Sequence, residues 1–141
     1  MEYIKSKESD ANELADLRAE AMKPSLVALG RFDENRVRTR FLDTFVAQDT
    51  VKIIAHDELV GLYVIRVRAD HLWLDHLYIK PQYQQKQLGK QVLDRVIQQA
   101  KALALPIRLG ALKGSRSNDF YLKNGFKQTH EDEFDLYYER V

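Results

Sequence analysis

The segment from residue 72 to residue 112 constrains the fold more strongly than any other part of this 141-residue chain. An apolar run at 72–79 leads through a polar loop into a helical pattern, and a second apolar run follows at 107–112. The apolar positions of the helical pattern keep one face, at Leu88, Val92, Leu93, Val96, Ile97, Ala100 and Leu103. Strands joined by a helix in this way pair in parallel, with a right-handed crossover. The sequence therefore predicts a mixed α/β fold.

Two further helices are expected nearer the N-terminus. Asp10 and Glu13 have the spacing of a capping box, and Asp33 can cap a second helix. Pro24 is expected to end or kink the first helix, because proline disrupts a helix interior. Residues 24–32 then form an unusually apolar loop between the two helices.

The other segments predict strands that are mostly antiparallel. A short strand is expected at 3–5, and a meander of β-branched and aromatic residues at 51–79. A short helix that Gly125 stops precedes a closing hairpin. The remaining expected segments are strands at 51–55, 59–68, 126–129 and 134–139 and the short helix at 117–123. The order is β-α-α-β-β-β-α-β-α-β-β, in a single domain over residues 1–141.

Composition excludes several classes of function. The 22 basic and 21 acidic side chains give a net charge of +1, without the clustered basic excess typical of nucleic-acid binders. No run approaches the roughly 18 apolar residues of a membrane span, so no membrane association is expected. Residues 1–8 carry charges where a signal peptide is apolar. We therefore expect a cytoplasmic protein that binds neither nucleic acid nor a membrane.

The chain contains no cysteine, which excludes disulfides, cysteine–zinc sites and a cysteine nucleophile. Its four histidines lack the spacing of a metal-binding motif, so no metal is expected. An acyl group, if one is transferred, does not pass through a thioester on the protein.

The polar loop before residue 88 is the most informative candidate for a ligand site. Backbone N–H groups at the start of a helix bind phosphate, helped by the helix dipole. Lys86 and Lys90 add positive charge, and Gly89 allows a close approach of backbone or ligand. The alternative is a solvated connection that binds nothing, since such loops are common.

Residues 77–90, Leu-Tyr-Ile-Lys-Pro-Gln-Tyr-Gln-Gln-Lys-Gln-Leu-Gly-Lys, resemble the acetyl-CoA motif of the GNAT N-acetyltransferases. That motif is an apolar strand followed by Q/R-x-x-G-x-G/A at the start of a helix. Gln84 matches its first position and Gly89 its last, whereas Gln87 replaces the usual middle glycine. We expect Gln87 to take an ordinary backbone conformation.

A second block, residues 118–126, resembles the later motif of the same family, in which a tyrosine and a few helical residues precede Gly-Phe. Tyr121 is that tyrosine here. The asparagine often found seven residues earlier is Gly114 in this chain, and Asn118 is its candidate substitute. Together with the order of elements, the two blocks identify the chain as similar to the GNAT family.

The resemblance implies a GNAT-like sheet in which the parallel strands at 72–79 and 107–112 splay apart to form an acyl-CoA cleft. The pyrophosphate is expected on backbone N–H groups of residues 85–90. The pantetheine arm is expected beside 77–79 as an added strand, where a backbone N–H polarises the thioester carbonyl. The implied contacts of acetyl-CoA, a co-substrate, are Leu77, Tyr78, Ile79, Gln84, Gln85, Lys86, Gln87, Leu88, Gly89, Lys90, Asn118 and Tyr121.

The resemblance also implies direct attack of an amine on acetyl-CoA, with Tyr121 as general acid for the thiolate. A phenol has a pKa of about 10 and a thiol has a pKa of about 8.5, so full proton transfer from Tyr121 to the thiolate is not required. A hydrogen bond from the phenol can suffice to stabilise the departing thiolate. The alternative for Tyr121 is simple packing. Asp75 and His76 are the candidate bases, and neighbouring strand residues point to opposite faces. Which one faces the cleft stays open, and ordinary strand polarity is the alternative for both.

The expected acceptor is a primary amine of a small molecule or a peptide. Residues 22–32 are expected to line its side of the cleft, with an apolar wall and the cations Lys23 and Arg31. Gln87 and the missing asparagine motivate a second reading, a non-catalytic acyl-CoA-binding regulatory domain. A third is an interaction module that uses the sheet edge. The oligomeric state stays open, with a homodimer as one option.

Overall fold

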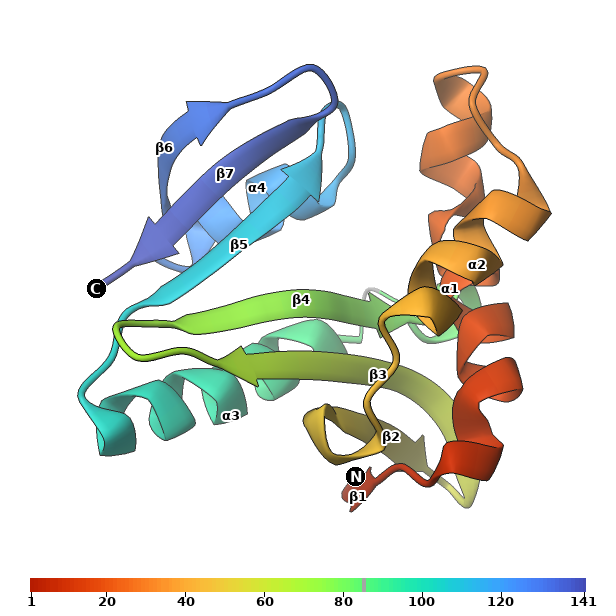
Figure 1. Ribbon diagram of the computed structural model, residues 1–141, viewed down its shortest axis with the longest axis horizontal. Coiled ribbons are helices and arrows are strands. Elements are labelled where there is room, and N and C mark those ends of the chain that lie inside the picture. Colours follow the sequence, from red (N-terminus) through yellow and green to blue (C-terminus); the bar gives the residue numbers. More distant parts are fainter. Residues whose placement is uncertain (85) are drawn as a thin grey trace. The chain divides into compact units, whose positions relative to one another are not determined.

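The computed structural model describes residues 1–84 and 86–141. In these residues seven strands form one sheet in the order β1-β2-β3-β4-β5-β7-β6 (Figure 1). The strands are β1 (Glu2–Lys5), β2 (Thr50–Ala55), β3 (Glu58–Val67), β4 (Leu72–Ile79), β5 (Ile107–Leu112), β6 (Lys127–Glu131) and β7 (Asp135–Arg140). The helices are α1 (Ala11–Ala28), α2 (Glu34–Asp43), α3 (Leu88–Leu103) and α4 (Ser117–Lys123). The predicted mixed α/β class and the order of elements are confirmed.

The sheet is mostly antiparallel, as predicted, and β4 and β5 form a parallel pair. The parallel register joins Leu72 to Ile107 and Trp73 to Arg108, at the start of both strands. The described residues divide into two compact units, 1–64 with 76–91 and 65–75 with 92–141. β3, β4 and α3 contribute residues to both units. That the chain acts as a single domain stays a prediction.

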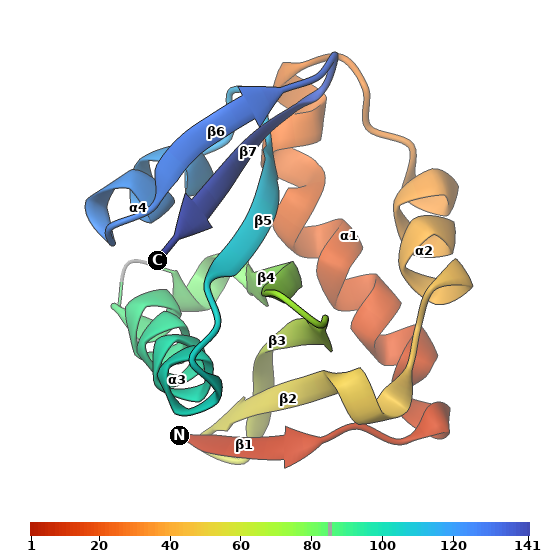
Figure 2. The same cartoon turned by 60° about the vertical axis from the view of Figure 1, so that its left-hand side comes forward.

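The first unit is built around α1 and α2, which lie side by side (Figures 1 and 2). Their apolar faces meet the middle of β3 in a cluster of buried side chains. The cluster consists of Leu14, Ala15, Leu17, Phe41, Leu62 and Val64. Full burial of a leucine side chain contributes roughly 1.5–3 kcal/mol, so this cluster anchors both helices to the sheet. Asp33 caps α2 as predicted, because its Oδ1 accepts from the Arg36 amide at 3.0 Å.

Pro24 does not end the first helix, because α1 continues through it to Ala28, so that part of the prediction is wrong. The helix stops at Gly30, whose φ of 67° is the left-handed conformation that glycine adopts readily. The Gly30 amide donates to Val27 O at 2.9 Å and the Arg31 amide to Leu26 O at 2.8 Å, which is a Schellman motif. Leu26 is buried, and its packing offsets the helical bond that proline cannot donate.

The predicted capping box at the start of α1 is also wrong. Asp10 makes no side-chain cap to α1, and its Oδ2 instead accepts from the Lys7 amide at 2.8 Å. That bond closes a short 3-10 turn, Glu8–Asp10, ahead of the helix. The backbone hydrogen bond from Lys7 lowers the pKa of Asp10, so the carboxylate stays charged there.

The second unit contains the antiparallel ladder of β5, β7 and β6. α4 covers one face of this ladder (Figure 2). The buried Tyr138 of β7 lies beneath the helix, with its ring centroid 6.3 Å from that of Tyr121 and its hydroxyl bonded to Asn118. Gly125, with a φ of 88°, ends α4 as predicted.

Candidate active site

The side chain of Gln84 fixes the start of the loop between β4 and α3. After Ile79 the chain makes a 3-10 turn, Pro81–Tyr83, and the Gln84 amide donates to Pro81 O at 3.2 Å. The Gln84 side chain reaches back, and its Nε2 donates to Ile79 O at 2.9 Å. Gln84 therefore ties the start of the loop to the end of β4. Gln85, a predicted phosphate contact, lies outside the described residues.

Gln87 adopts a left-handed conformation with φ of 60°, so the expectation of an ordinary backbone is wrong. Its carbonyl accepts from the Gln91 amide at 3.2 Å and begins the hydrogen-bond ladder of α3. The turn into the helix requires this conformation, which costs a residue with a side chain roughly 1–2 kcal/mol. Gln87 thus holds the backbone shape that glycine would adopt at this position.

The start of α3 has the properties of an anion site. Amides in the first turn of a helix point outward from the ladder, and the helix dipole adds partial positive charge. Leu88 and Gly89 lie in that turn, together with Lys90. Lys86 precedes it, with Nζ 5.7 Å from the centre of the Tyr83 ring. Of the predicted phosphate contacts, residues 86–90 thus lie together at the N-terminus of α3.

β3 and β4 approach each other closely at Gly61, a residue that the sequence analysis did not single out. A Cβ at Gly61 would lie 2.5 Å from Tyr78 O and 2.8 Å from Ile79 Cδ1. On its other side Gly61 is paired with Ile53 of β2. The register between β2 and β3 shifts there, between Ile53 and Ile54, which is a β-bulge. Gly61 therefore shapes the part of β4 where the pantetheine arm is expected. A glycine inside a strand pattern was the available signal.

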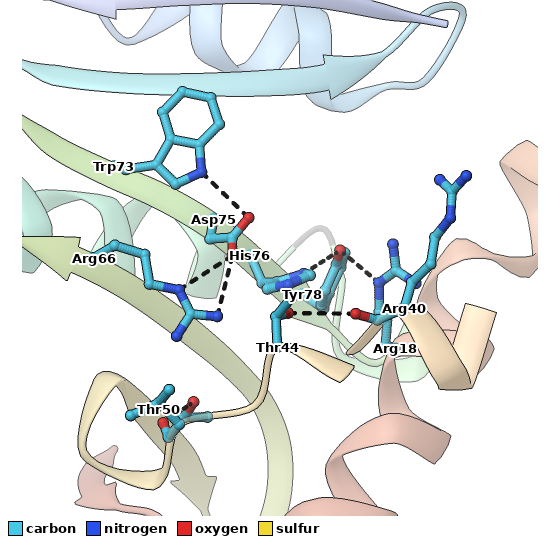
Figure 3. Close-up of polar contacts among 10 residues, drawn as sticks. Arg18, Arg40, Thr44, Thr50, Arg66, Trp73, Asp75, His76 and Tyr78 are labelled. Atoms are coloured by element: carbon cyan, nitrogen blue, oxygen red, sulfur yellow. Dashed lines mark hydrogen bonds and ion pairs between the residues drawn. The ribbon is translucent and has the colours of Figure 1, made fainter. Parts of the chain in front are cut away.

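His76 belongs to a polar network in the first unit (Figure 3). Its Nδ1 lies 2.8 Å from the Tyr78 hydroxyl, to which Arg18 Nε donates at 3.1 Å. Arg18 also donates through Nη1 to Val37 O, and only 8% of its surface is exposed. The Phe41 ring meets the imidazole edge-on at 5.3 Å. Sequence reasoning missed Arg18, although its place one turn after Leu14 puts it on the buried face of α1.

Asp75 belongs to a different network, in the second unit (Figure 3). Its Oδ2 accepts from both Nε and Nη2 of Arg66 at 3.2 Å, and its Oδ1 accepts from Trp73 Nε1 at 3.3 Å. The Arg66 side chain is 9% exposed and that of Asp75 is 29% exposed. Both carboxylate oxygens are thus engaged, one of them by a cation. Neither Arg66 nor Trp73 was among the predicted site residues.

Tyr121 lies on α4 and is buried among aromatic rings. Its ring meets Phe126 at 5.4 Å and Phe120 at 5.3 Å, both edge-on. Its carbonyl accepts from the Phe126 amide at 3.1 Å, which fixes the turn after the helix. This geometry is compatible with both readings of the residue, a general acid and a packing tyrosine.

Asn118 holds the connection between β5 and α4. Its Nδ2 donates to Leu112 O at 2.9 Å and to Ser115 O at 3.0 Å, and its Oδ1 accepts from the Tyr138 hydroxyl at 2.9 Å. Burial, followed by the charge of Asp119, raises the pKa of Tyr138, so that hydroxyl stays protonated and donates. A contact of Asn118 with acetyl-CoA stays a prediction.

Among the described residues, no group of three or more histidine, aspartate or glutamate side chains is arranged to hold a metal ion. None of the helices in residues 1–84 and 86–141 is long and apolar enough to cross a membrane.

Several solved structures share this fold. The PaiA N-acetyltransferase of Thermoplasma acidophilum, in complex with coenzyme A, has a TM-score of 0.81 and 22% identity, covering 99% of this chain and 97% of that one. An acetyltransferase of Thermus thermophilus has a TM-score of 0.79 and 16% identity, covering 99% and 95%. A GNAT family acetyltransferase of Elizabethkingia anophelis with acetyl-CoA bound has a TM-score of 0.57 and 18% identity, covering 64% and 74%.

At these identities the structural likeness establishes the fold. No curated protein sequence matches the chain. The family model described as "Acetyltransferase (GNAT) domain" matches residues 41–128, which contain both sequence blocks discussed above. The predicted resemblance is thereby confirmed, and the chain belongs to the GNAT family of acetyltransferases.

Proposed function

We propose that this chain is an acetyl-CoA-dependent N-acetyltransferase, which moves an acetyl group to a primary amine of a small molecule or a peptide. The observation that carries the proposal is the left-handed Gln87 at the start of α3. Glutamine is strained in that conformation, and the first-turn amides thereby keep the arrangement that a glycine would give. The chain departs from the family motif at this position, and Gln87 takes a conformation that glycine adopts readily.

The proposed binding path follows from the residues around that turn. The pyrophosphate binds the amides of residues 86–90, with Lys86 and Lys90 supplying charge. The pantetheine arm pairs with the backbone of Leu77–Ile79 as an added strand. A backbone N–H of this segment donates to the thioester oxygen as negative charge develops on it.

The proposed reaction is a direct transfer. The amine nitrogen attacks the thioester carbonyl carbon, the carbon–sulfur bond breaks, and the thiolate takes a proton from Tyr121. The acceptor amine, whose pKa is near 10, loses its proton to Asp75, His76 or water. The transfer needs no covalent acyl intermediate on the protein, and the lack of cysteine excludes a protein thioester.

A second candidate is a non-catalytic acyl-CoA-binding regulatory domain. The replacement of the motif glycine by Gln87, one of the two grounds for this candidate, is weakened because Gln87 takes a left-handed conformation that glycine adopts readily. The engagement of Asn118 with Leu112, Ser115 and Tyr138 favours this candidate, because the amide of Asn118 serves the fold.

Thermal unfolding with and without acetyl-CoA tests the proposal. Ligand at about 100 times its dissociation constant is expected to add about 2.7 kcal/mol to the free energy of unfolding. Lys86→Gln should reduce this stabilisation, because Lys86 precedes the anion site. The matched control is Lys113→Gln, since Lys113 pairs with Glu131 at 2.7 Å on another segment, and it should keep the full effect. No stabilisation by acetyl-CoA or any other acyl-CoA would exclude both acyl-CoA readings.

Replacing Gln87 by glycine is expected to stabilise the protein and to preserve or tighten acetyl-CoA binding. The variant removes the strain of a left-handed residue that carries a side chain, which should raise the free energy of unfolding by about 1 kcal/mol. The shape of the loop should stay unchanged. Calorimetric titration with acetyl-CoA and denaturant unfolding measure the two effects.

The matched control for that variant is Ala104→Gly, because Ala104 also has a positive φ, 55°, and follows the other end of α3. It should gain similar stability with no change in acetyl-CoA affinity. A loss of affinity beyond about tenfold in Gln87→Gly, or about 1.4 kcal/mol, would identify the glutamine side chain itself as a ligand.

A further inference from the structure

Arg18 of α1 is a buried cation in the first unit. Only 8% of its surface is exposed, and its guanidinium carbon lies 5.9 Å from the centre of the Tyr78 ring. Tyr78 in turn packs against the apolar cluster that anchors α1 and α2. A charged side chain is almost never buried to this extent unless an opposite charge pairs with it. The groups that surround Arg18 therefore indicate whether its charge is balanced within the protein.

The hydrogen-bond partners of Arg18 are both neutral. Its Nε donates to the Tyr78 hydroxyl at 3.1 Å (Figure 3), and its Nη1 donates to the Val37 carbonyl of α2. These bonds leave further N–H donors of the guanidinium unused. Nη2 makes no hydrogen bond within residues 1–84 and 86–141, and no buried side-chain nitrogen there is left without a partner. Nη2 therefore lies where solvent or a ligand can reach it.

Two other arginines show what Arg18 lacks. Arg66 is equally buried, and it holds the Asp75 carboxylate through both Nε and Nη2. Arg38 of α2 joins the same two helices as Arg18 and pairs with Asp16 of α1. No carboxylate of the described residues pairs with Arg18. The acidic side chains of α1 and α2 are all exposed, namely Glu13, Asp16, Glu20, Glu34 and Asp43.

The position of Arg18 indicates which ligand can supply the balancing charge. Tyr78, which accepts from Arg18, belongs to the segment Leu77–Ile79 that is proposed to pair with the pantetheine arm. That arm is neutral, and the phosphates of acetyl-CoA are assigned to residues 86–90, beyond the end of β4. An anionic group at Arg18 would therefore belong to the acceptor. A carboxylate fits, because it accepts charge-assisted hydrogen bonds from a guanidinium, and these are strong where water is excluded.

We propose that Arg18 binds a carboxylate of the acceptor, so that the substrate class is a primary amine that also carries a carboxylate, as an amino acid does. This inference rests on the proposed acetyltransferase function and narrows its acceptor. The bound carboxylate balances the charge of Arg18 and holds the amine beside the pantetheine segment. A site built to bind a polar group rejects analogues that lack the group, so amines without a carboxylate are poor acceptors.

The wild-type protein tests the proposal with matched acceptors, which are L-amino acids and the corresponding amino-acid amides. We expect kcat/KM to be at least about tenfold higher for the acids, with rates expressed per neutral amine. This correction is needed because loss of the carboxylate also lowers the pKa of the amine. Equal values for acid and amide, or a preference for the amide, would overturn the proposal without recourse to any variant.

Variants assign the preference for acids to Arg18. Arg18→Gln keeps an N–H donor and removes the charge, so the preference should fall below about threefold. Arg18→Lys keeps the cation and should retain part of the preference. The matched control is Arg38→Gln, which removes an arginine that already has a carboxylate partner and should keep the whole preference. An undiminished preference in Arg18→Gln would place the carboxylate elsewhere and overturn the proposal.

Melting temperatures distinguish failure of this inference from failure of the proposed function. With coenzyme A present, the amino acids should raise the melting temperature of the wild type more than their amides do. Acetyl transfer to neutral amines alone would keep the proposed function and overturn this inference. Stabilisation by the acids, lost in Arg18→Gln, without transfer to any amine would keep the carboxylate site and overturn the function. Neither stabilisation nor transfer would overturn both.

Discussion

Tyr121→Phe is expected to lower kcat by roughly 10- to 1000-fold while acetyl-CoA affinity stays nearly unchanged. The variant removes one hydroxyl and keeps the ring, so the edge-on contacts with Phe120 and Phe126 are preserved. A proton given to the departing thiolate is an interaction of the transition state, and its loss lowers kcat and kcat/KM together. Steady-state kinetics with the true acceptor, beside a titration with acetyl-CoA, measure both quantities.

The matched control for that variant is Tyr137→Phe. Tyr137 also donates its hydroxyl to a side chain, Asp132 at 2.6 Å, and that bond raises the pKa of Tyr137 to about 12. It lies in the β6–β7 hairpin and has no part in the proposed reaction. Tyr137→Phe should therefore keep the wild-type kcat. Full activity in Tyr121→Phe would assign that residue to packing alone.

Gly61→Ala is expected to lower the free energy of unfolding by roughly 3 kcal/mol, at the upper end of the range for overpacking. The new methyl group would meet the Tyr78 carbonyl oxygen at 2.5 Å, and a backbone atom in a sheet can move only if the strand moves. That corresponds to a fall of about 10 °C in the melting temperature for a chain of this size. Displacement of β4 should also weaken acetyl-CoA binding, since Leu77–Ile79 are the proposed pairing segment.

Gly110→Ala is the comparison for this effect. Gly110 is also inside a strand, but its Cβ would meet the side chain of Tyr137, at 2.9 Å from Cε1, and a side chain can turn away. The expected loss is about 1 kcal/mol or less, with acetyl-CoA binding unchanged. Equal losses in the two variants would contradict the role assigned to Gly61.

The sequence predicted the elements of this fold well because their hydrophobic periods are strong. The amphipathic helix α3 and the meander of β2, β3 and β4, rich in β-branched and aromatic residues, appear at the expected positions. The end of α1 was misread because Pro24 is a conspicuous breaker, whereas buried Leu26 carries the helix on to a Schellman motif at Gly30. The sequence has two helix-ending residues close together, Pro24 and Gly30, and tertiary packing determines that the helix ends at the second.

The candidate site was predicted only in part. The sequence motifs identified the loop, Tyr121 and the pair Asp75 and His76 as candidate site residues. A motif does not show which other side chains contact each of these residues. Arg18 is 60 residues from Tyr78 in the sequence, and Arg66 on β3 meets Asp75 on β4, so both roles depend on how the chain folds. The conformation of Gln87 was misjudged because it depends on a turn whose shape is dictated by the adjoining strand and helix.

The central claim is tested most directly by release of free coenzyme A from acetyl-CoA in the presence of a panel of primary amines, including small molecules and peptides. The wild type is expected to release coenzyme A with at least one amine, in equal amount to an acetylated product identified by mass spectrometry. Tyr121→Phe should slow that release without loss of acetyl-CoA binding. Tight binding of acetyl-CoA with no acetylated product from any amine in the panel would contradict the account and favour a non-catalytic acyl-CoA-binding domain.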